Sequence, residues 1–170
     1  MKRSGRTLKQ RLYDLKHIPS YMRRARYFRG HGVHSPYIYA IVRQVFMSSK
    51  FISEERALYD HLLAVDVPQK RALQLQNLAH HCNYTSWAID NLEKCDIIIA
   101  SMNTTYDELD KFYDYALKEG ITLCIIRPYN NAKRWEVCKA IIERHPSTTV
   151  DNRGYLLVFN NHLPKQKFRL

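Results

Sequence analysis

The stretch that most constrains the fold is the run Cys95-Asp96-Ile97-Ile98-Ile99-Ala100-Ser101. Four apolar residues follow one another without alternation, which is typical of a strand buried on both faces, as in a parallel sheet. Ligands of open α/β sheets bind just beyond the carboxyl ends of such strands. Enzymes of this class usually place a carboxylate there, whereas this chain has Ser101. The sequence therefore indicates more about fold than about function, and it argues against catalysis.

The size and composition of the chain predict a single domain, or one domain with an appended segment. It has 170 residues, of which 45% are hydrophobic, enough for a real core. No apolar run approaches the roughly 20 residues that a membrane span needs. The N-terminus lacks the apolar region of a secretory signal. It is rich in arginine, as a mitochondrial presequence is, but its apolar positions continue into segments expected to fold. We therefore expect a cytoplasmic protein.

Four cysteines bear on the compartment and on metal binding, and none of them has CxxC spacing: Cys82, Cys95, Cys124 and Cys138. We expect free thiols in a reducing cytosol. The histidines at positions 31, 34, 80 and 81 raise the question of a metal site, but zinc needs three or four convergent ligands with suitable spacing. Local capping or hydrogen bonding by histidines in turns is the interpretation we favour. We therefore expect no metal site.

The positive charge is concentrated at one end of the chain. Residues 1–30 contain ten basic residues and one acid, a net charge of +9, and the remaining 140 residues carry only +2. Four of these arginines lie within two helical turns: Arg23, Arg24, Arg26 and Arg29. They can contact nucleic-acid phosphates or an anionic membrane surface. The interpretation that we favour is that they form a solvated helix face or pair with acids such as Glu54 and Asp107.

The first part of the chain is predicted to be helical and forms a basic N-terminal segment over residues 1–68. Helices are expected at 7–18, 21–28, 36–47 and from about 53 to 65. Ser35 and Pro36 have the pattern of an N-cap followed by proline at the first helical position. Pro68 closes the segment.

Strands and helices alternate over residues 69–170, which indicates βαβ units and a largely parallel sheet. Strands are expected at 72–75, 96–100 and 121–126, and helices at 79–92, from 105 or 107 to 118, and 133–144. Gly120 is expected to cap the second of these helices at its C-terminus. Segments 148–150 and 155–159 are predicted to form a hairpin around Asn152-Arg153-Gly154.

Several motifs in this order resemble a known family. They are His31-Gly32-Val33-His34-Ser35-Pro36-Tyr37, the strand and turn over 96–106, His145-Pro146, and the tail over 164–168. On these motifs, about residues 20–68 and 94–170 resemble the class I S-adenosylmethionine-dependent methyltransferase-like proteins of Bacteroidetes. The resemblance implies a Rossmann-like sheet with strand order 1-4-5-7-6 in the parent numbering.

The departures from that family predict a truncated and degenerate form. The family binds its cofactor with a glycine-rich loop after the first strand, and the matching stretch 75–81 has no glycine. Only 20 residues separate Leu75 from Asp96, room for one crossover of roughly 10–12 residues or more where the parent fold has three. The second and third strands are therefore expected to be deleted. The acids that the family carries after its fourth and fifth strands are replaced by Ser101 and Arg127-Pro128.

These observations favour a non-catalytic, methyltransferase-like protein that acts as a binding or oligomerisation module, with no catalytic, cofactor-binding or metal-binding residues. Deletion of half the sheet would expose an edge near residues 72–75, which a partner chain, a second copy or the N-terminal helices would cover. A residual pocket is expected at Ser101, Asn103, Tyr106 and Arg127, where Arg127 can bind an anion. Two alternatives stay open: a nucleic-acid-binding protein that uses the basic arm, and an S-adenosylmethionine-dependent methyltransferase with an atypical cofactor site.

Overall fold

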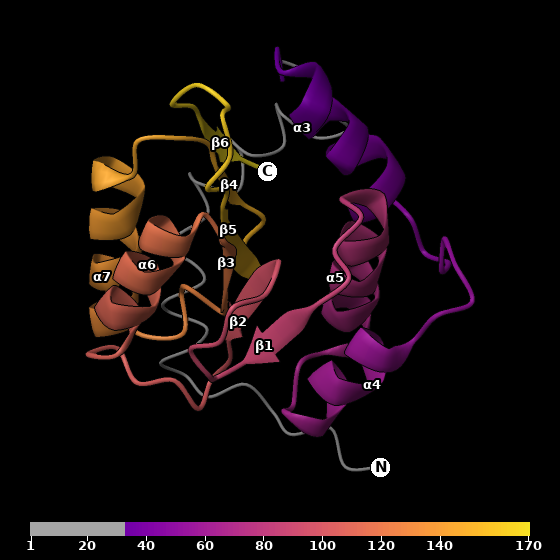
Figure 1. Ribbon diagram of the computed structural model, residues 1–170, viewed down its shortest axis with the longest axis horizontal. Coiled ribbons are helices and arrows are strands. Elements are labelled where there is room, and N and C mark those ends of the chain that lie inside the picture. Colours follow the sequence, from indigo (N-terminus) through magenta and orange to yellow (C-terminus); the bar gives the residue numbers. More distant parts are fainter. Residues whose placement is uncertain (1–32) are drawn as a thin grey trace, which may run out of the picture.

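A mixed six-stranded sheet lies between two layers of helices in the computed structural model, which describes residues 33–170 (Figure 1). The elements, in chain order, are α3 (Pro36–Ile41), the π-helical turn η2 (Val42–Phe46), α4 (Ala57–Ala64), α5 (Gln69–His81), β1 (Trp87–Ile89), β2 (Ile97–Ala100), α6 (Leu109–Glu119), β3 (Thr122–Ile126), α7 (Ala132–Arg144), β4 (Thr149–Asp151), β5 (Tyr155–Val158) and β6 (Lys167–Arg169). The predicted helices at 7–18 and 21–28 and the basic arm lie outside the described residues. The fold class is thus α/β.

The strands follow the order β1-β2-β3-β5-β4-β6 across the sheet. β1, β2 and β3 pair in parallel, β5 pairs antiparallel with both β3 and β4, and β6 pairs in parallel with β4. The expected hairpin around 152–154 is confirmed, because Val150 lies opposite Leu157. β6 was not predicted. It is a short, half-exposed edge strand with the sequence Lys-Phe-Arg, too short to show an apolar pattern.

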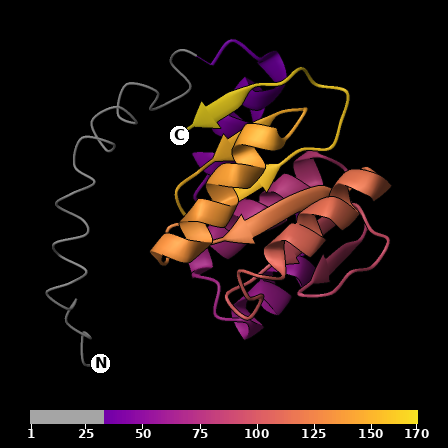
Figure 2. The same ribbon diagram turned by 90° about the vertical axis from the view of Figure 1, so that its left-hand side faces the viewer.

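Successive side chains of the central strands enter opposite layers, as the pleat of a strand requires. Ile97 and Ile99 pack with the helices α3 to α5, whereas Ile98 and Ala100 pack with α6 and α7. Figure 2 looks onto the second layer, with α6 and α7 in front of the sheet. The unbroken apolar run of β2 is therefore explained by burial on both faces, as expected from the sequence. The first layer also draws core residues from both sides of residue 68, and the division into two domains there stays a prediction.

Two helices begin or end at the capping residues predicted from the sequence, and one begins later than expected. The Ser35 side chain accepts a hydrogen bond from the Ile38 N–H at 3.4 Å, and Pro36 begins α3. Gly120 ends α6 in the left-handed conformation, with φ of 70°. The helix expected from about residue 53 begins only at Ala57. The chain before it is held by a tertiary contact, in which the Ile52 N–H donates to Asn77 Oδ1 at 3.1 Å.

Two predicted elements are wrong, namely the strand at 72–75 and the helix at 79–92. Residues 72–75 belong to helix α5, and the chain forms strand β1 at Trp87–Ile89. The apolar residues of α5 recur at helical spacing, at Ala72, Leu75 and Ala79, and they face the core. The short apolar run at 72–75 is therefore one turn of a helix that is buried almost all round.

Buried amide side chains of α5 explain why this helix tolerates polar residues in the core. Gln74 Nε2 donates to the Phe46 carbonyl oxygen at 2.7 Å, and Gln76 Oε1 accepts from the Tyr59 N–H at 3.0 Å. Buried polar groups need such partners. These amides satisfy backbone groups of η2 and α4. The stretch 75–81, matched on resemblance to a cofactor loop, is instead part of a packing helix.

The connection between β1 and β2 consists of only seven residues, 90–96, and contains no helix. Parallel strands are usually joined by a crossover of a dozen or more residues. Here Asp90 adopts a positive φ of 53°, which turns the chain away directly after β1. Asp96 then accepts hydrogen bonds from the backbone N–H groups of Thr85 and Ser86 at 2.7 and 2.9 Å. The expected single crossover with its helix is thus replaced by a tight loop pinned at both ends.

Candidate functional site

The carboxyl ends of the parallel strands lie at one end of the sheet, where the sequence predicted a residual pocket. β1 is followed there by Asp90, β2 by Ser101, and β3 by Arg127. Asp90 is not among the predicted site residues, because the sequence pattern predicts a helix over 79–92. The feature of the sequence that could have identified Asp90 is a carboxylate directly after the short apolar stretch Trp87–Ile89.

The Asp90 carboxylate is held by three donors from the loop after β2. The Ser101 backbone N–H donates to Oδ1 at 2.7 Å, the Ser101 hydroxyl to Oδ2 at 2.5 Å, and the Thr104 hydroxyl to Oδ1 at 2.5 Å. Ser101 and Thr104 are both buried. The carboxylate therefore ties the ends of two neighbouring strands together, and both of its oxygens are engaged within the protein.

A buried arginine occupies the space beyond β2 and β3. Arg134, in the first turn of α7, is 3% exposed and donates to three backbone carbonyl oxygens: those of Ile126 at 3.2 Å, Thr104 at 2.8 Å and Ser101 at 2.8 Å. Burial lowers the pKa of its guanidinium, and the nearby Asp90 charge opposes that shift. Sequence reasoning missed this role because Arg134 sits on a helix whose other charged residues face solvent.

The predicted pocket residues make separate contacts, and a pocket shared by all four stays a prediction. Ser101 and Asn103 lie together, since the Asn103 N–H donates to the Ser101 hydroxyl at 3.0 Å. Tyr106 packs instead beneath Lys133, whose ammonium lies 5.1 Å from the ring centroid. Arg127 lies on the far side of β3, where its N–H donates to the Gly154 carbonyl oxygen at 2.9 Å. The other predicted contact residues, Arg23, Arg24, Arg26 and Arg29, lie outside the described residues.

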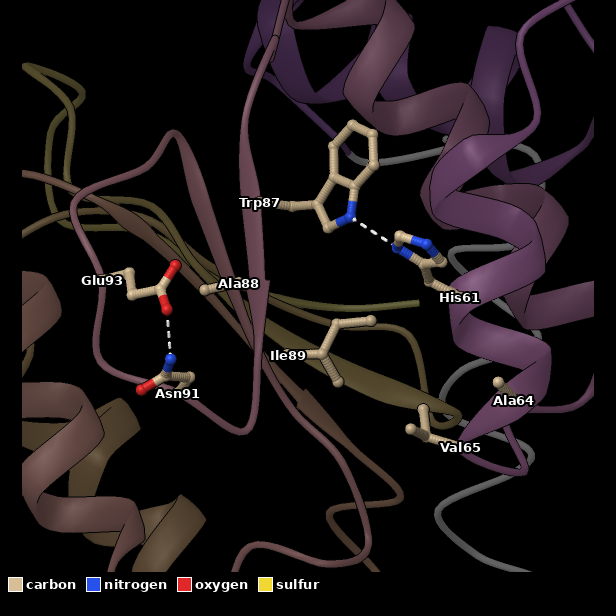
Figure 3. A pocket seen from close by; sticks show the side chains of 8 residues that line it. All are labelled: His61, Ala64, Val65, Trp87, Ala88, Ile89, Asn91 and Glu93. Atoms are coloured by element: carbon tan, nitrogen blue, oxygen red, sulfur yellow. Dashed lines mark hydrogen bonds between the residues drawn. The ribbon is translucent and has the colours of Figure 1, made fainter.

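A cleft of about 410 Å³ runs along β1 at the edge of the sheet (Figure 3). It is lined by residues of α4 and its C-terminus, of β1 and of the 90–96 loop: His61, Ala64, Val65, Trp87, Ala88, Ile89, Asn91 and Glu93. In Figure 3, Trp87 and Ile89 project toward α4, while Asn91 and Glu93 lie on the other side of the strand. The cleft thus wraps around the outer edge of β1. This is the exposed sheet edge, rather than the one expected near residues 72–75.

Backbone hydrogen bonds show which peptide groups of β1 face the cleft. The Ser86 carbonyl oxygen accepts from the Asp96 N–H at 3.2 Å, and the Asp90 N–H donates to the Ile99 carbonyl oxygen at 3.0 Å. Residues 86 and 90 therefore point toward β2, and peptide groups alternate in direction along a strand. The N–H and C=O groups of Trp87 and Ile89 consequently point away from the sheet. No strand of the described residues pairs with that side.

The polar groups of the cleft have defined roles. Trp87 Nε1 donates to His61 Nδ1 at 3.4 Å, so the His61 proton is on Nε2 when the ring is neutral. Asn91 donates to the Glu93 carboxylate. Glu93 is the one acidic residue among the eight that line the cleft. The wider segments 54–66 and 83–96 contain seven acids and two bases, a net charge of −5 in a chain of net charge +11. The cleft therefore lies between segments of net negative charge in a basic protein.

The described residues show neither a metal site nor a membrane-spanning helix. No group of three or more His, Cys, Asp or Glu side chains is placed to hold a metal ion within 33–170. No helix in that part of the chain combines the length and apolarity needed to cross a bilayer. All four cysteines are free thiols, as expected, and burial raises the pKa of Cys138 to about 12. The described thiols are thus weakly acidic packing residues.

Comparisons with protein-family models, with curated proteins and with solved structures give no match to this chain. The assignment of a function therefore depends on the chain's own geometry.

Proposed function

We propose that this protein is a non-catalytic binding module, built on a truncated Rossmann-like sheet of the methyltransferase type, that receives an extended basic segment of a partner chain along β1. The observation that carries the proposal is the set of peptide groups of Trp87 and Ile89 that point into the cleft at the sheet edge. An added strand pairs with such groups, and the flanking pockets select its side chains. The acidic surroundings favour a basic occupant.

The arrangement at the strand ends supports the non-catalytic part of this proposal. In an open α/β sheet, the ligand lies in the crevice beyond the parallel strands. Here Arg134 fills that space by bonding to backbone carbonyl groups, and both oxygens of the Asp90 carboxylate accept hydrogen bonds from Ser101 or Thr104. A carboxylate that acts as a base or a cofactor ligand needs a lone pair directed at the ligand. These groups instead stabilise the fold.

The binding experiment uses Trp87 as its reporter. The full chain carrying Trp135→Phe has one tryptophan, which lies in the cleft. We expect a peptide of alternating Lys and Val to change its fluorescence saturably, and matched peptides of alternating Glu and Val, or with a central proline, to have much weaker effects. Glu93→Lys should weaken the basic peptide about tenfold, in the range found for charged interface contacts. Glu136→Lys, an exposed reversal on α7, should leave binding unchanged.

Three results would contradict the proposal. One is the absence of any response to the basic peptide, and another is equal loss of binding in the two charge-reversal variants. The third is self-association of the full chain that Glu93→Lys abolishes, because a second copy of the protein would then occupy the cleft. Analytical ultracentrifugation over a range of protein concentrations detects the last of these.

Nucleic-acid binding through Arg23, Arg24, Arg26 and Arg29 is a second candidate, favoured by the net charge of +9 over residues 1–30. It predicts an affinity for duplex DNA that falls steeply with salt and shows little sequence preference. Replacement of the four arginines by alanine should then abolish the salt-dependent mobility shift. The peptide response of Trp87 should persist in that variant, which separates the two candidate functions.

A further inference from the structure

The two faces of β1 differ in the side chains that they offer to a strand added at its open edge. Trp87 and Ile89 pack with the helical layer of α3 to α5, whereas Ala88 packs with the layer of α6 and α7. The side chains of an added strand alternate between the same two faces. One face of the cleft therefore receives every second residue of the occupant, and the other face receives the residues between them.

The face of the cleft on the α4 side is mainly apolar. Ala64 and Val65, at the C-terminal end of α4, line it together with Trp87 and Ile89 (Figure 3). His61 is the polar side chain on this side, and its Nδ1 already accepts from Trp87 Nε1 at 3.4 Å. Apolar side chains of the occupant that pack here remove their own surface and that of the cleft from water, which is favourable.

The opposite face combines a small side chain with a carboxylate. In Figure 3, Ala88 and Glu93 lie on the same side of β1, away from α4. The methyl group of Ala88 fills little of the cleft beside the strand. Glu93 is exposed and accepts one hydrogen bond from Asn91, whereas a carboxylate has about four acceptor sites. This face therefore has the space and the acceptor capacity for a long basic side chain.

The peptide groups of β1 determine which residue of the occupant meets which face. The N–H and C=O groups of Trp87 and Ile89 point outward, and those of Ala88 point toward β2. Residues that lie directly opposite each other in a ladder carry their side chains on the same face. The occupant residue opposite Ala88 therefore points to the Glu93 side. Its two neighbours, opposite Trp87 and Ile89, point to the α4 side.

We propose that the β1 cleft selects the motif apolar–basic–apolar, with the basic residue opposite Ala88 on the side of Glu93. This inference rests on the proposed function, because it requires a strand added at β1, and it goes further by assigning each side chain of the occupant to a face. A segment that carries its apolar and basic side chains on one face satisfies only one face of the cleft at a time. A charged group set against the apolar side loses its water without gaining a partner.

Two nine-residue peptides of identical composition test the motif, with the fluorescence of Trp87 in the full chain carrying Trp135→Phe as the readout. The first, Gly-Ser-Thr-Val-Lys-Val-Thr-Ser-Gly, carries both valines on one face and the lysine on the other. The second, Gly-Ser-Val-Thr-Lys-Thr-Val-Ser-Gly, carries the valines and the lysine on the same face. We expect the first peptide to bind about tenfold more tightly, because only its side chains suit both faces at once.

Exchange of the lysine for glutamine in the first peptide tests the contact with Glu93. The exchange should weaken binding to the parent chain about tenfold, and binding to Glu93→Gln by no more than about twofold, because the charged pair is already absent there. Glu136→Gln, at an exposed position on α7, is the matched control and should respond to the exchange as the parent does.

The outcomes separate this inference from the proposed function. Equal affinities of the two peptides, or tighter binding of the second, would overturn the motif and leave strand addition at β1 standing. A loss on lysine exchange that is as large in Glu93→Gln as in the parent would overturn it as well, because the basic residue would not meet Glu93. No fluorescence response to either peptide would contradict the proposed function itself, and the motif with it.

Discussion

Single polar side chains complete hydrogen bonds that the short strands and loops of this fold leave open. Arg134 bonds three carbonyl oxygens at the ends of β2 and β3, and Asn77 bonds the Lys50 carbonyl oxygen and the Ile52 N–H. Each replaces bonds that a longer strand or helix would have made. Such roles cannot be read from one sequence, because the residue types are those of an ordinary helix surface.

Arg134→Met should lower the free energy of unfolding by about 3 kcal/mol, because three buried carbonyl groups lose a charged donor. Denaturant unfolding followed by circular dichroism measures the change. Lys139→Met, at an exposed position on the same helix, should alter stability by no more than about 0.5 kcal/mol. Similar values for the two variants would show that the Arg134 bonds do not stabilise the strand ends.

His145 predicts a pH dependence of stability. The side chain is fully buried, its Nε2 lies 3.0 Å from the Phe159 carbonyl oxygen, and burial lowers its pKa. In the unfolded chain, His145 therefore binds a proton near pH 6.5, whereas in the folded chain it stays neutral at that pH. The free energy of unfolding should fall as the pH drops below about 6.5. His145→Gln, which cannot titrate, should reduce this slope in thermal unfolding curves between pH 7.5 and 5.5. His162→Gln, at an exposed site, should retain it, and an unaltered slope in His145→Gln would refute the assignment.

At the scale of elements, apolar runs predicted the central strands and failed at the first one. β2 and β3 were predicted because four or five successive buried residues leave few alternatives. β1 has only three residues and is joined to β2 by a loop half the usual length, so neither its pattern nor its spacing indicated a strand. The same error placed the free edge at 72–75 and concealed Asp90.

The effect of Asp90→Ala on stability shows whether the hydrogen bonds of Asp90 serve the fold or a function. Asp90→Ala should lower the free energy of unfolding by about 2 kcal/mol, because the buried Ser101 N–H and the Thr104 hydroxyl lose their acceptor. Glu93→Ala, in the same loop but exposed, should change stability by less than about 0.5 kcal/mol. Urea denaturation of both variants tests this. Unchanged or increased stability of Asp90→Ala would be typical of a residue kept for function, and would favour the methyltransferase alternative.

At the scale of the whole molecule, the sheet has an open edge and closed strand ends. The cleft follows the free edge of β1, and Asp90 and Arg134 close the carboxyl ends of the parallel strands. The sequence predicted the α/β class and the hairpin, because these follow from apolar patterns and turn residues. It did not predict which side chains fill the strand ends, because that depends on contacts between α7 and loops about 30 residues away.

Calorimetric titration of the full chain with S-adenosylmethionine shows whether the protein's own side chains fill the crevice at the strand ends. We expect no saturable heat up to millimolar ligand, because Arg134 and the hydrogen bonds of Asp90 occupy the place where a cofactor would bind. Saturable binding at micromolar concentration would contradict this expectation, since a cofactor site would then exist in spite of these contacts.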